Sequence, residues 1–421
     1  MERASISKKL FQGDKSIWII FLLLCSVSII EAFSATSTLA LSQANIWIPI
    51  VRHTTFLIIG FLLVLGIAHV PHRFFQLGML LMPLTIILLA ITLIAGFMEN
   101  ETTRRISALG TPFQPSEFGK LACVIFIAFF LSKREKFSNN KTSKIISYVV
   151  AIVCGLILRA NLSTVLLIVP VTFFMMYIGQ ISFTIILKRL FEWIAVAFLI
   201  FFLLFVSPPE LRQKIMPRAA TWIARLERYI NTDERQTNNT YIVNDNNYQI
   251  AHAKMAIARG GVLGKLPGKS LLRDFLPQAY SDFIYVIIIE EFGIFIGGIG
   301  VLLLYIMLMI RVAIIARRCE KSFPQFLVLG CGLLIVFQAL VHMAVSVGFF
   351  PVTGQPLPLI SIGGTSIIVT SICIGMILSV SHFGANMSDK DEEEEEENEA
   401  ENEAYPAENH NLVPEFTAIE S

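Results

Sequence analysis

Long apolar runs separated by short polar connections recur along most of the 421-residue chain. A run of about 18 or more apolar residues is long enough to cross a bilayer as a helix. Two clear cases are "SIWIIFLLLCSVSIIEAF", which begins at Ser16, and "FQLGMLLMPLTIILLAITLIAGF". The pattern predicts ten membrane-spanning helices, at residues 16–38, 53–70, 75–97, 116–132, 144–158, 162–180, 188–207, 283–310, 325–348 and 364–384.

The composition supports this interpretation. The chain is 55% hydrophobic and 15% charged, whereas soluble globular chains have about 45–50% apolar and roughly 25% charged residues. The first run continues as a full span without an A-x-A-type cleavage site, which predicts a retained helix and not a removed signal peptide. We therefore expect an all-α polytopic membrane protein. No segment has the pattern of a soluble domain or a nucleic-acid-binding module.

Lysine and arginine are distributed unevenly among the connections. If residues 1–15 are cytoplasmic, sixteen of these cations fall in inner segments, and the short outer loops hold only Arg52, Arg104, Arg105 and Arg159. Cytoplasmic loops carry an excess of Lys and Arg, so the pattern predicts that both termini are cytoplasmic. The connection at about residues 207–281 is then a large extracytoplasmic loop, and loops of this length are usually functional or disordered.

The last part of the chain differs from the rest. From Asp389 to Ser421 there are 14 Asp and Glu residues against one Lys. Such a low-complexity, self-repelling segment predicts disorder. We expect a ten-helix membrane domain over residues 16–385, followed by an acidic disordered cytoplasmic tail over residues 386–421.

Several ionisable residues fall inside the predicted spans, where they are expensive and indicate function by default. Glu117 and Lys120 open the fourth span and lie three residues apart, hence on one helix face. They can neutralise each other, and a structural ion pair and a substrate contact both remain open. Glu31, Glu192 and His342 are isolated, and each is predicted to form a hydrogen bond to a neighbouring helix.

The stretch "LPQAYSDFIYVIIIEEFG" places Asp282 directly before the eighth predicted span. As a helix cap it would contribute about 1 kcal/mol, and Ser281 could fill that position as well. A carboxylate at a dry margin can instead have a raised pKa and act as a base near neutrality. Glu290 lies roughly 80° around the helix from Asp282, and Glu291 lies on the opposite face. Neither is therefore an obvious acid–base partner.

Two irregular stretches complete the set of candidate features. "GKLPGKS" (264–270) is similar to a phosphate-binding P-loop but has three residues between its glycines, where that motif needs four. Its glycines lie beside Lys265, Lys269 and Arg273, which suits an anionic ligand such as a lipid-linked diphosphate. "FFPVTGQPLPLISIGGTS" contains three prolines and three glycines between the last two spans. Such backbone persists at membrane depth only where it is buried in protein or lines a cavity.

Three blocks together resemble the SEDS family (shape, elongation, division and sporulation) of FtsW/RodA-type proteins. They are "RRISALGTPFQPSEFGKLA", "YQIAHAKMAIARGGVLGKLPGKSLLRDFLPQAYSDFIYVIIIEEFG" and "FFPVTGQPLPLISIGGTS". The resemblance covers essentially all of residues 15–385. It implies a ten-helix enzyme of the bacterial cytoplasmic (inner) membrane. This enzyme would polymerise lipid II, the undecaprenyl-diphosphate-linked disaccharide peptide, into peptidoglycan strands. It also implies a class B penicillin-binding protein and other division proteins as partners. The third block favours the division type, and hence the septum.

The resemblance also implies site residues. The essential aspartate of the family falls on Asp282, and Glu117 and Lys120 match its intramembrane acid and base. The chain departs from the family pattern at Gln278 and Tyr280, where Glu and His are usual, and at Asn161, where Asp is usual. Leu266 and Pro267 also interrupt the glycine run. We expect substrate contacts from Arg104, Arg105, Gln114, Glu117, Lys120, Gln249, Lys265, Lys269, Ser270, Arg273 and Ser361.

These residues suggest a mechanism. Asp282 would take the proton from the 4-hydroxyl of the acceptor sugar as that oxygen attacks the anomeric carbon of the donor. Cations would stabilise the departing undecaprenyl diphosphate, and the sequence leaves open a divalent metal (Mg²⁺ or Mn²⁺) in that role. Two alternatives stay open: a lipid flippase or transporter, and a non-enzymatic scaffold of the division machinery.

Overall fold

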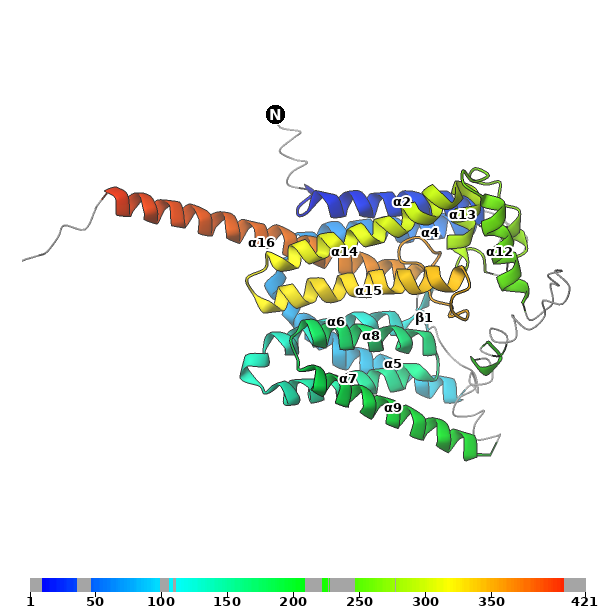
Figure 1. Cartoon of the computed structure of the whole chain (residues 1–421), viewed down its shortest axis with the longest axis horizontal. Coiled ribbons are helices and arrows are strands. Elements are labelled where there is room, and N and C mark those ends of the chain that lie inside the picture. The colour runs from blue at the N-terminus through cyan, green and yellow to red at the C-terminus, as the bar shows by residue number, and fades with distance from the viewer. Residues whose placement is uncertain are drawn as a thin grey trace, which may run out of the picture.

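The computed structural model describes residues 10–35, 47–98, 106–108, 111–208, 222–225, 227, 247–276 and 278–404. These residues form a bundle of helices that lie side by side along one direction (Figure 1). The long helices are α2 (Lys15–Ala35), α4 (Trp47–Ala68), α5 (Leu81–Met98), α6 (Pro115–Ser132), α7 (Asn139–Leu158), α8 (Leu162–Ile178), α9 (Phe183–Val206), α14 (Val301–Arg317), α15 (Ser322–Ser346) and α16 (Gly364–Ala404).

Shorter elements gather mainly at one end of the bundle, where α12 and α13 lie in Figure 1. The helical ones are η1 (His72–Leu80), η2 (Arg134–Lys136), α12 (Tyr248–Gly260), η3 (Leu272–Asp274), α13 (Ile284–Gly293) and the π-helical η4 (Ile294–Gly300). Strands β1 (Ile106–Ala108) and β2 (Thr111–Phe113) pair antiparallel.

Eight helical segments of the described chain are long and apolar enough to cross a membrane. The two other predicted spans correspond to α8, an apolar helix of 17 residues, and to α9. The predicted all-α polytopic membrane fold is therefore confirmed. The eight segments are 15–34, 47–68, 72–95, 115–132, 139–158, 284–317, 322–346 and 364–384.

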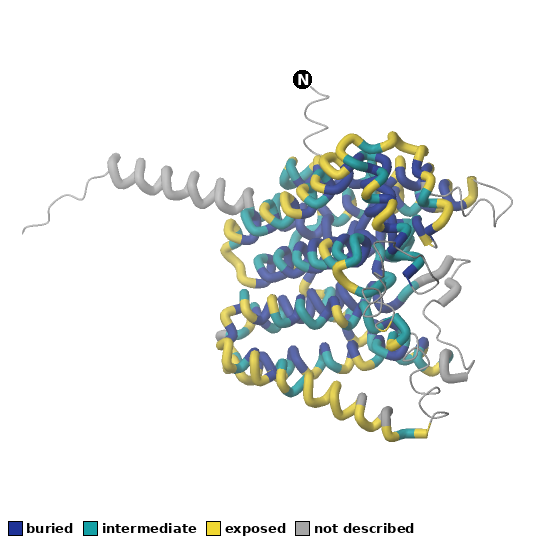
Figure 2. Tube along the Cα trace, turned by 45° about the vertical axis from the view of Figure 1, so that its right-hand side comes forward, coloured by how far each residue is buried: buried dark blue, intermediate teal, exposed yellow. Residues whose placement is uncertain are grey.

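Two helices form the centre of the bundle. In α6 and α15, 78% and 72% of the membrane-spanning window is buried, against 17% for the span of η1 and α5. The outer part of α9 exposes its apolar side chains along most of its length, as Figure 2 shows in yellow. Apolar side chains on such a helix face lipid without cost, because the bilayer is as apolar as they are.

The element bounds differ from the prediction in three places. Helix α4 begins at Trp47 and not at residue 53, so it includes the polar pair Arg52 and His53. The eighth predicted span is divided into α13, η4 and α14, because Gly293 has φ +80° and breaks the regular α-helix.

The third difference concerns the acidic tail. Disorder was predicted from residue 386, but α16 continues as one helix to Ala404 and extends beyond the bundle (Figure 1). Glu and Ala have high helix propensity, and extending an existing helix needs no new nucleus. The rest of the predicted tail, residues 405–421, lies outside the described residues.

Candidate functional site

The connection between α15 and α16, residues 347–363, is held inside the protein by hydrogen bonds to several elements. The Ser361 hydroxyl donates to the Ser281 carbonyl (2.9 Å) and accepts from the Leu357 amide (2.8 Å). The Tyr305 hydroxyl donates to the Pro358 carbonyl at 2.5 Å. Because the irregular backbone is paired in this way, it can persist at membrane depth, as the sequence predicted.

A buried ion pair on α6 helps to hold the α15–α16 connection in place. The Lys120 ammonium lies 2.8 Å from the Glu117 carboxylate, and both side chains are almost completely buried. Lys120 also donates to the Gln338 side-chain oxygen at 2.6 Å, and the Gln338 amide donates to the Pro356 carbonyl at 2.8 Å. The chain of contacts thus joins α6, α15 and the α15–α16 connection. Breaking such a buried pair by removing one partner is strongly destabilising.

A second set of contacts fixes Gln355. His342 Nδ1 lies 2.8 Å from the Gln355 carbonyl, and since a carbonyl only accepts, Nδ1 carries the proton. The Gln355 amide donates to the Thr164 hydroxyl at 3.1 Å, and the Ser163 hydroxyl donates to the Thr353 carbonyl at 2.5 Å. His342 was predicted to bond a neighbouring helix, but its partner is the α15–α16 connection.

These elements enclose a polar cavity of about 400 Å³. Its walls come from α4, the start of α6, the N-cap of α8, the segment before α13, the α15–α16 connection and the start of α16. Among the described lining residues, Arg52 is the one Arg or Lys and Glu117 is the one carboxylate. The polar lining residues are Arg52, His53, Gln114, Glu117, Asn161, Gln278, Tyr280, Ser281, Gln355, Thr365 and Ser366.

Asp282 directly follows the lining residue Ser281 but is not itself one of the residues that line this cavity. A Cβ on Gly354 would lie 3.7 Å from Asp282 Oδ2. The Ser281 hydroxyl donates to Oδ1 at 3.1 Å, and the Ser346 hydroxyl donates to the Asp282 carbonyl at 3.2 Å. The Asp282 carboxylate therefore has one side-chain donor and an oxygen facing a residue with no side chain.

Burial raises the pKa of Asp282 above the ordinary aspartate value. The hydrogen bond from Ser281 and the positive charge of Arg225 act in the opposite direction and lower the pKa by less than burial raises it. Arg225 is held nearby because its guanidinium donates to the Val352 carbonyl at 2.9 Å. A half-buried carboxylate of this kind is a stronger base than an exposed aspartate.

The glycine–lysine segment, residues 261–271, packs directly on the backbone of α13. The amides of Lys265 and Leu266 donate to the carbonyls of Glu290 (3.0 Å) and Glu291 (2.8 Å). Gly264 has φ +78°, and a Cβ there would lie 2.2 Å from the Glu291 carbonyl oxygen. Only glycine allows this approach. The segment thus supplies hydrogen bonds to the backbone where α13 gives way to η4.

The predicted site residues fall into two groups. Gln114 and Glu117 line the cavity, with Lys120 behind them and Asp282 at the edge. Lys265, Lys269, Ser270 and Arg273 lie instead on or beside the glycine–lysine segment.

The individual environments differ within these groups. Lys265 and Lys269 are exposed, whereas the buried Ser270 donates to Glu290 at 2.5 Å. Gln249 is half-buried on α12, and Ser361 holds the α15–α16 connection. Arg104 and Arg105 lie outside the described residues.

Sequence reasoning missed the roles of Arg52, His53, Gln278 and Gln355 as cavity-lining residues. Arg52 and His53 interrupt an otherwise apolar run, and that interruption was the available signal. His53 is buried, and its Nε2 lies 2.7 Å from the Ser28 hydroxyl. Gln355 carried no comparable signal, because its position depends on contacts with α8 and α15. No group of three or more His, Cys, Asp or Glu side chains that could hold a metal occurs within the described residues.

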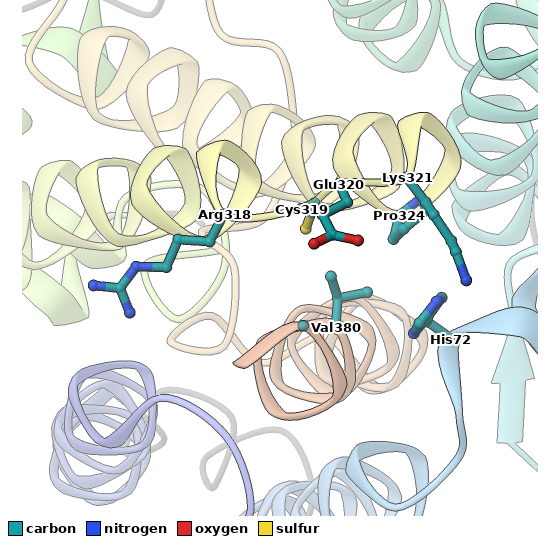
Figure 3. A pocket seen from close by; sticks show the side chains of 8 residues that line it. His72, Arg318, Cys319, Glu320, Lys321, Pro324 and Val380 are labelled. Atoms are coloured by element: carbon teal, nitrogen blue, oxygen red, sulfur yellow. The ribbon is translucent and has the colours of Figure 1, made fainter. Parts of the chain in front are cut away.

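A second, smaller hollow of about 20 Å³ lies at the opposite end of the bundle, beside the α14–α15 connection. Figure 3 shows Lys321 directed toward His72, with Arg318 directed away on the other side of Glu320. The predicted topology places this end in the cytoplasm, where an excess of cations is expected. None of the predicted site residues lines it.

The apolar helical bundle with a polar cavity at one end has the architecture of a multi-pass membrane protein. A family model described as "Cell cycle protein", that of FtsW, RodA and SpoVE, matches residues 14–386. The chain belongs to this family, and its enzyme class is glycosyltransferase.

Individual relatives agree with this assignment. The "Probable peptidoglycan glycosyltransferase FtsW" of Haemophilus influenzae is 32% identical over 308 residues, which are 71% of this chain and 72% of that protein. The protein of the same name from Trichlorobacter lovleyi is 26% identical over 381 residues, 89% of this chain and 94% of that protein.

The fold is shared with a chain of the solved structure "Structural coordination of polymerization and crosslinking by a peptidoglycan synthase complex". The TM-score is 0.65 at 24% identity, and the match covers 88% of this chain and 98% of that chain.

Proposed function

We propose that this protein polymerises lipid II into peptidoglycan glycan strands at the outer face of the inner membrane, during septal wall synthesis. Relatives named peptidoglycan glycosyltransferase FtsW support the reaction class. The observation that carries the proposal is the position of Asp282. Its half-buried carboxylate, with a pKa raised by burial, lies at the edge of the polar cavity.

In the proposed reaction Asp282 is the general base. It accepts the proton of the acceptor 4-hydroxyl while that oxygen forms a bond to the anomeric carbon of the donor. The bond from that carbon to the diphosphate oxygen breaks, and the diphosphate leaves with the electron pair. A diphosphate is already a good leaving group, so no dedicated general acid is required. One essential carboxylate is then sufficient, in contrast to the paired carboxylates of glycosidases.

The cavity offers groups for the sugar and for the diphosphate. We assign Gln114, Glu117 and Asn161 to sugar hydroxyls and amides, because they line the cavity and can donate or accept hydrogen bonds. We propose that Arg52, which lines the cavity, stabilises the charge of the leaving diphosphate. Further candidates for stabilising the diphosphate charge are Arg104, Arg105, Lys265 and Lys269. Gln249 remains a candidate for another substrate contact.

Four of the predicted substrate contacts fit a positioning role better. The side chains of Lys120, Ser270, Arg273 and Ser361 already make hydrogen bonds to protein groups, and only Arg273 keeps a buried nitrogen, Nε, without a hydrogen-bond partner within the described residues. A group whose hydrogen bonds are satisfied gains less from a ligand than an unpaired group does. We propose that these side chains hold Asp282, Glu117 and the glycine–lysine segment in place.

We further propose that a class B penicillin-binding protein and other division proteins are the partners. The fold shared with a chain of a peptidoglycan synthase complex supports this assignment. In the proposed topology residues 1–15 form a cytoplasmic segment, residues 16–385 the membrane domain, and residues 386–421 a cytoplasmic tail. The loop of about residues 207–281 then lies outside, with the cavity.

The reaction is tested by supplying lipid II to the purified protein with its class B synthase, in detergent and in liposomes. The proposal predicts glycan polymer in detergent, resolved on a gel. Lipid II crossing the liposome bilayer without polymer would instead identify a flippase. If neither polymer nor crossing occurs with a folded, partner-bound protein, a scaffold role replaces the enzyme.

A further inference from the structure

Glu31 on α2 is a buried carboxylate without a hydrogen-bond partner. Its side chain is 0% exposed, and neither carboxylate oxygen has a partner within the described part of the chain. The predicted hydrogen bond from Glu31 to a neighbouring helix is therefore absent there. An ionised carboxylate that is buried without a partner is strongly unfavourable, so this position requires a compensating charge.

A second buried carboxylate lies near it. Glu291 on α13 is 1% exposed, accepts a short hydrogen bond from the Ser34 hydroxyl, and leaves its other oxygen without a partner. Arg273 donates to the Ser34 carbonyl (2.9 Å) and hydroxyl (3.0 Å). Glu31 lies three residues before Ser34 and therefore on the same face of α2, the face that contacts Glu291 and Arg273. Ser34 therefore links the cation to one of two buried anions.

The charges of this cluster do not balance. Glu290, the neighbouring carboxylate, has its own cation, because Arg259 lies 3.3 Å from it. Arg273 is then shared between Glu31 and Glu291, and its other ion pair is with Asp274, which is 48% exposed and screened by water. Among the charged groups of the described residues, one negative charge is left over in this buried region between α2 and α13.

We propose that Glu31 and Glu291 bind a single proton between them, and that this proton keeps the glycine–lysine segment docked on α13. Two carboxylates that share a buried site cannot both ionise, so one keeps its proton. Binding of a metal ion in the same place is disfavoured, because the Arg273 guanidinium already supplies one positive charge there. The protonated carboxyl group then donates a hydrogen bond to the other carboxylate, so two of the three unpaired oxygens gain a partner.

The consequence lies in the segment that Glu291 touches. The Glu291 carboxylate accepts from the Ser34 hydroxyl, to which Arg273 also donates, and the main-chain carbonyl of Glu291 accepts from the Leu266 amide. When the shared proton leaves at alkaline pH, the two carboxylates repel each other, and the contacts of Glu291 weaken. The segment that carries Lys265 and Lys269 then opens more often. This inference rests on the cluster alone and stands whether or not the proposed polymerisation is correct.

The proton can be detected by infrared spectroscopy of the full-length protein in nanodiscs. The variants are Glu31→Gln, which keeps the shape and removes the acid, and Glu192→Gln as control. Glu192 is also a carboxylate of a helix in the bundle but pairs with Arg189 at 2.5 Å. At neutral pH the wild type should show a protonated carboxyl band that Glu31→Gln loses and Glu192→Gln keeps. If the band is absent in the wild type or persists in Glu31→Gln, the proposal is wrong.

Docking is read from deuterium exchange of the peptide that covers residues 261–271. The ratio of exchange in the wild type to that in Glu31→Gln, taken at each pH, should rise as pH increases. A constant ratio would mean that Glu31 has only a structural role and would overturn the coupling. If Glu31→Gln does not fold, Glu291→Gln gives the same test, because either substitution leaves one carboxylate for Arg273.

Discussion

Ser361 donates a hydrogen bond to the Ser281 carbonyl across 2.9 Å, and this contact joins the α15–α16 connection to the residue before Asp282. The same hydroxyl accepts from the Leu357 amide. One buried side chain thus fixes both walls of the cavity edge where the proposed base lies.

Ser361→Ala should therefore destabilise the protein and lower its turnover. The substitution leaves the Leu357 amide and the Ser281 carbonyl without their partner, at a cost of about 1–3 kcal/mol. Thermal unfolding and lipid II polymerisation measure the two effects. Ser26→Ala is the matched control, because Ser26 is exposed and bonds only the Leu22 carbonyl of its own helix. Equal Tm values for the two variants would contradict the proposed role of Ser361.

Lys120→Met should be far more damaging than the loss of a surface cation. Glu117 would remain buried without its partner, which costs about 3–5 kcal/mol. The double variant Glu117→Gln with Lys120→Met should regain most of that stability. If the pair also contacts substrate, this double variant stays inactive although it folds. A double variant with wild-type polymerisation would show that the pair is only structural.

Alanine substitutions at two glycines of the glycine–lysine segment distinguish the stability cost of close packing from the cost of backbone strain. Gly264 and Gly268 have similar positive φ, +78° and +81°, but only Gly264 lies against other backbone. Gly268→Ala should cost about 1–2 kcal/mol from the left-handed conformation. Gly264→Ala adds a clash with the Glu291 carbonyl and should undock the segment, with a larger fall in Tm. Similar losses for both variants would argue against the docked arrangement.

Polymerisation should weaken at low pH, because Asp282 must be ionised to act as a base. Its pKa is raised by burial above the ordinary value of about 3.9, so the acid limb of kcat/KM lies above that pH. Arg225→Gln removes a charge that lowers this pKa, and the limb should move to higher pH. Arg317→Gln, at the opposite end of the bundle, should leave it in place. A limb that moves to lower pH in Arg225→Gln would refute the assignment.

Much of the fold could be predicted from the sequence, because lipid requires each span to satisfy its own backbone and stay apolar. The misplaced start of α4 shows the limit. Arg52 and His53 looked like a boundary, but both line the cavity and His53 also bonds Ser28, so tertiary contacts keep them in the helix. The break in the helix at Gly293 could not be predicted either. The hydrogen bonds that compensate for it come from the glycine–lysine segment, which lies earlier in the chain.

Individual residues of the candidate site could be predicted from the sequence, but which of them lie together could not. Asp282, Gln114 and Glu117 could be named because charges are rare in spans and because the motifs resemble a family. Ser270 and Arg273 were expected at the substrate, but their side chains bond Glu290 and Ser34. Both side chains can donate hydrogen bonds to an anion. Whether that anion is a substrate or a protein carboxylate depends on the packing of α2 against α13, which the sequence does not show.

The most direct test of the account compares Asp282→Asn with Asp274→Asn in the lipid II polymerisation assay with the synthase partner. Asp274 is a 48% exposed carboxylate on the same loop. The raised pKa of Asp282 means that its ionised form opposes folding as pH rises, so Asp282→Asn should unfold at a temperature no lower than the wild type. The account predicts polymer from the wild type and Asp274→Asn, and none from a folded Asp282→Asn protein. Polymer from Asp282→Asn at the wild-type rate would contradict the central claim.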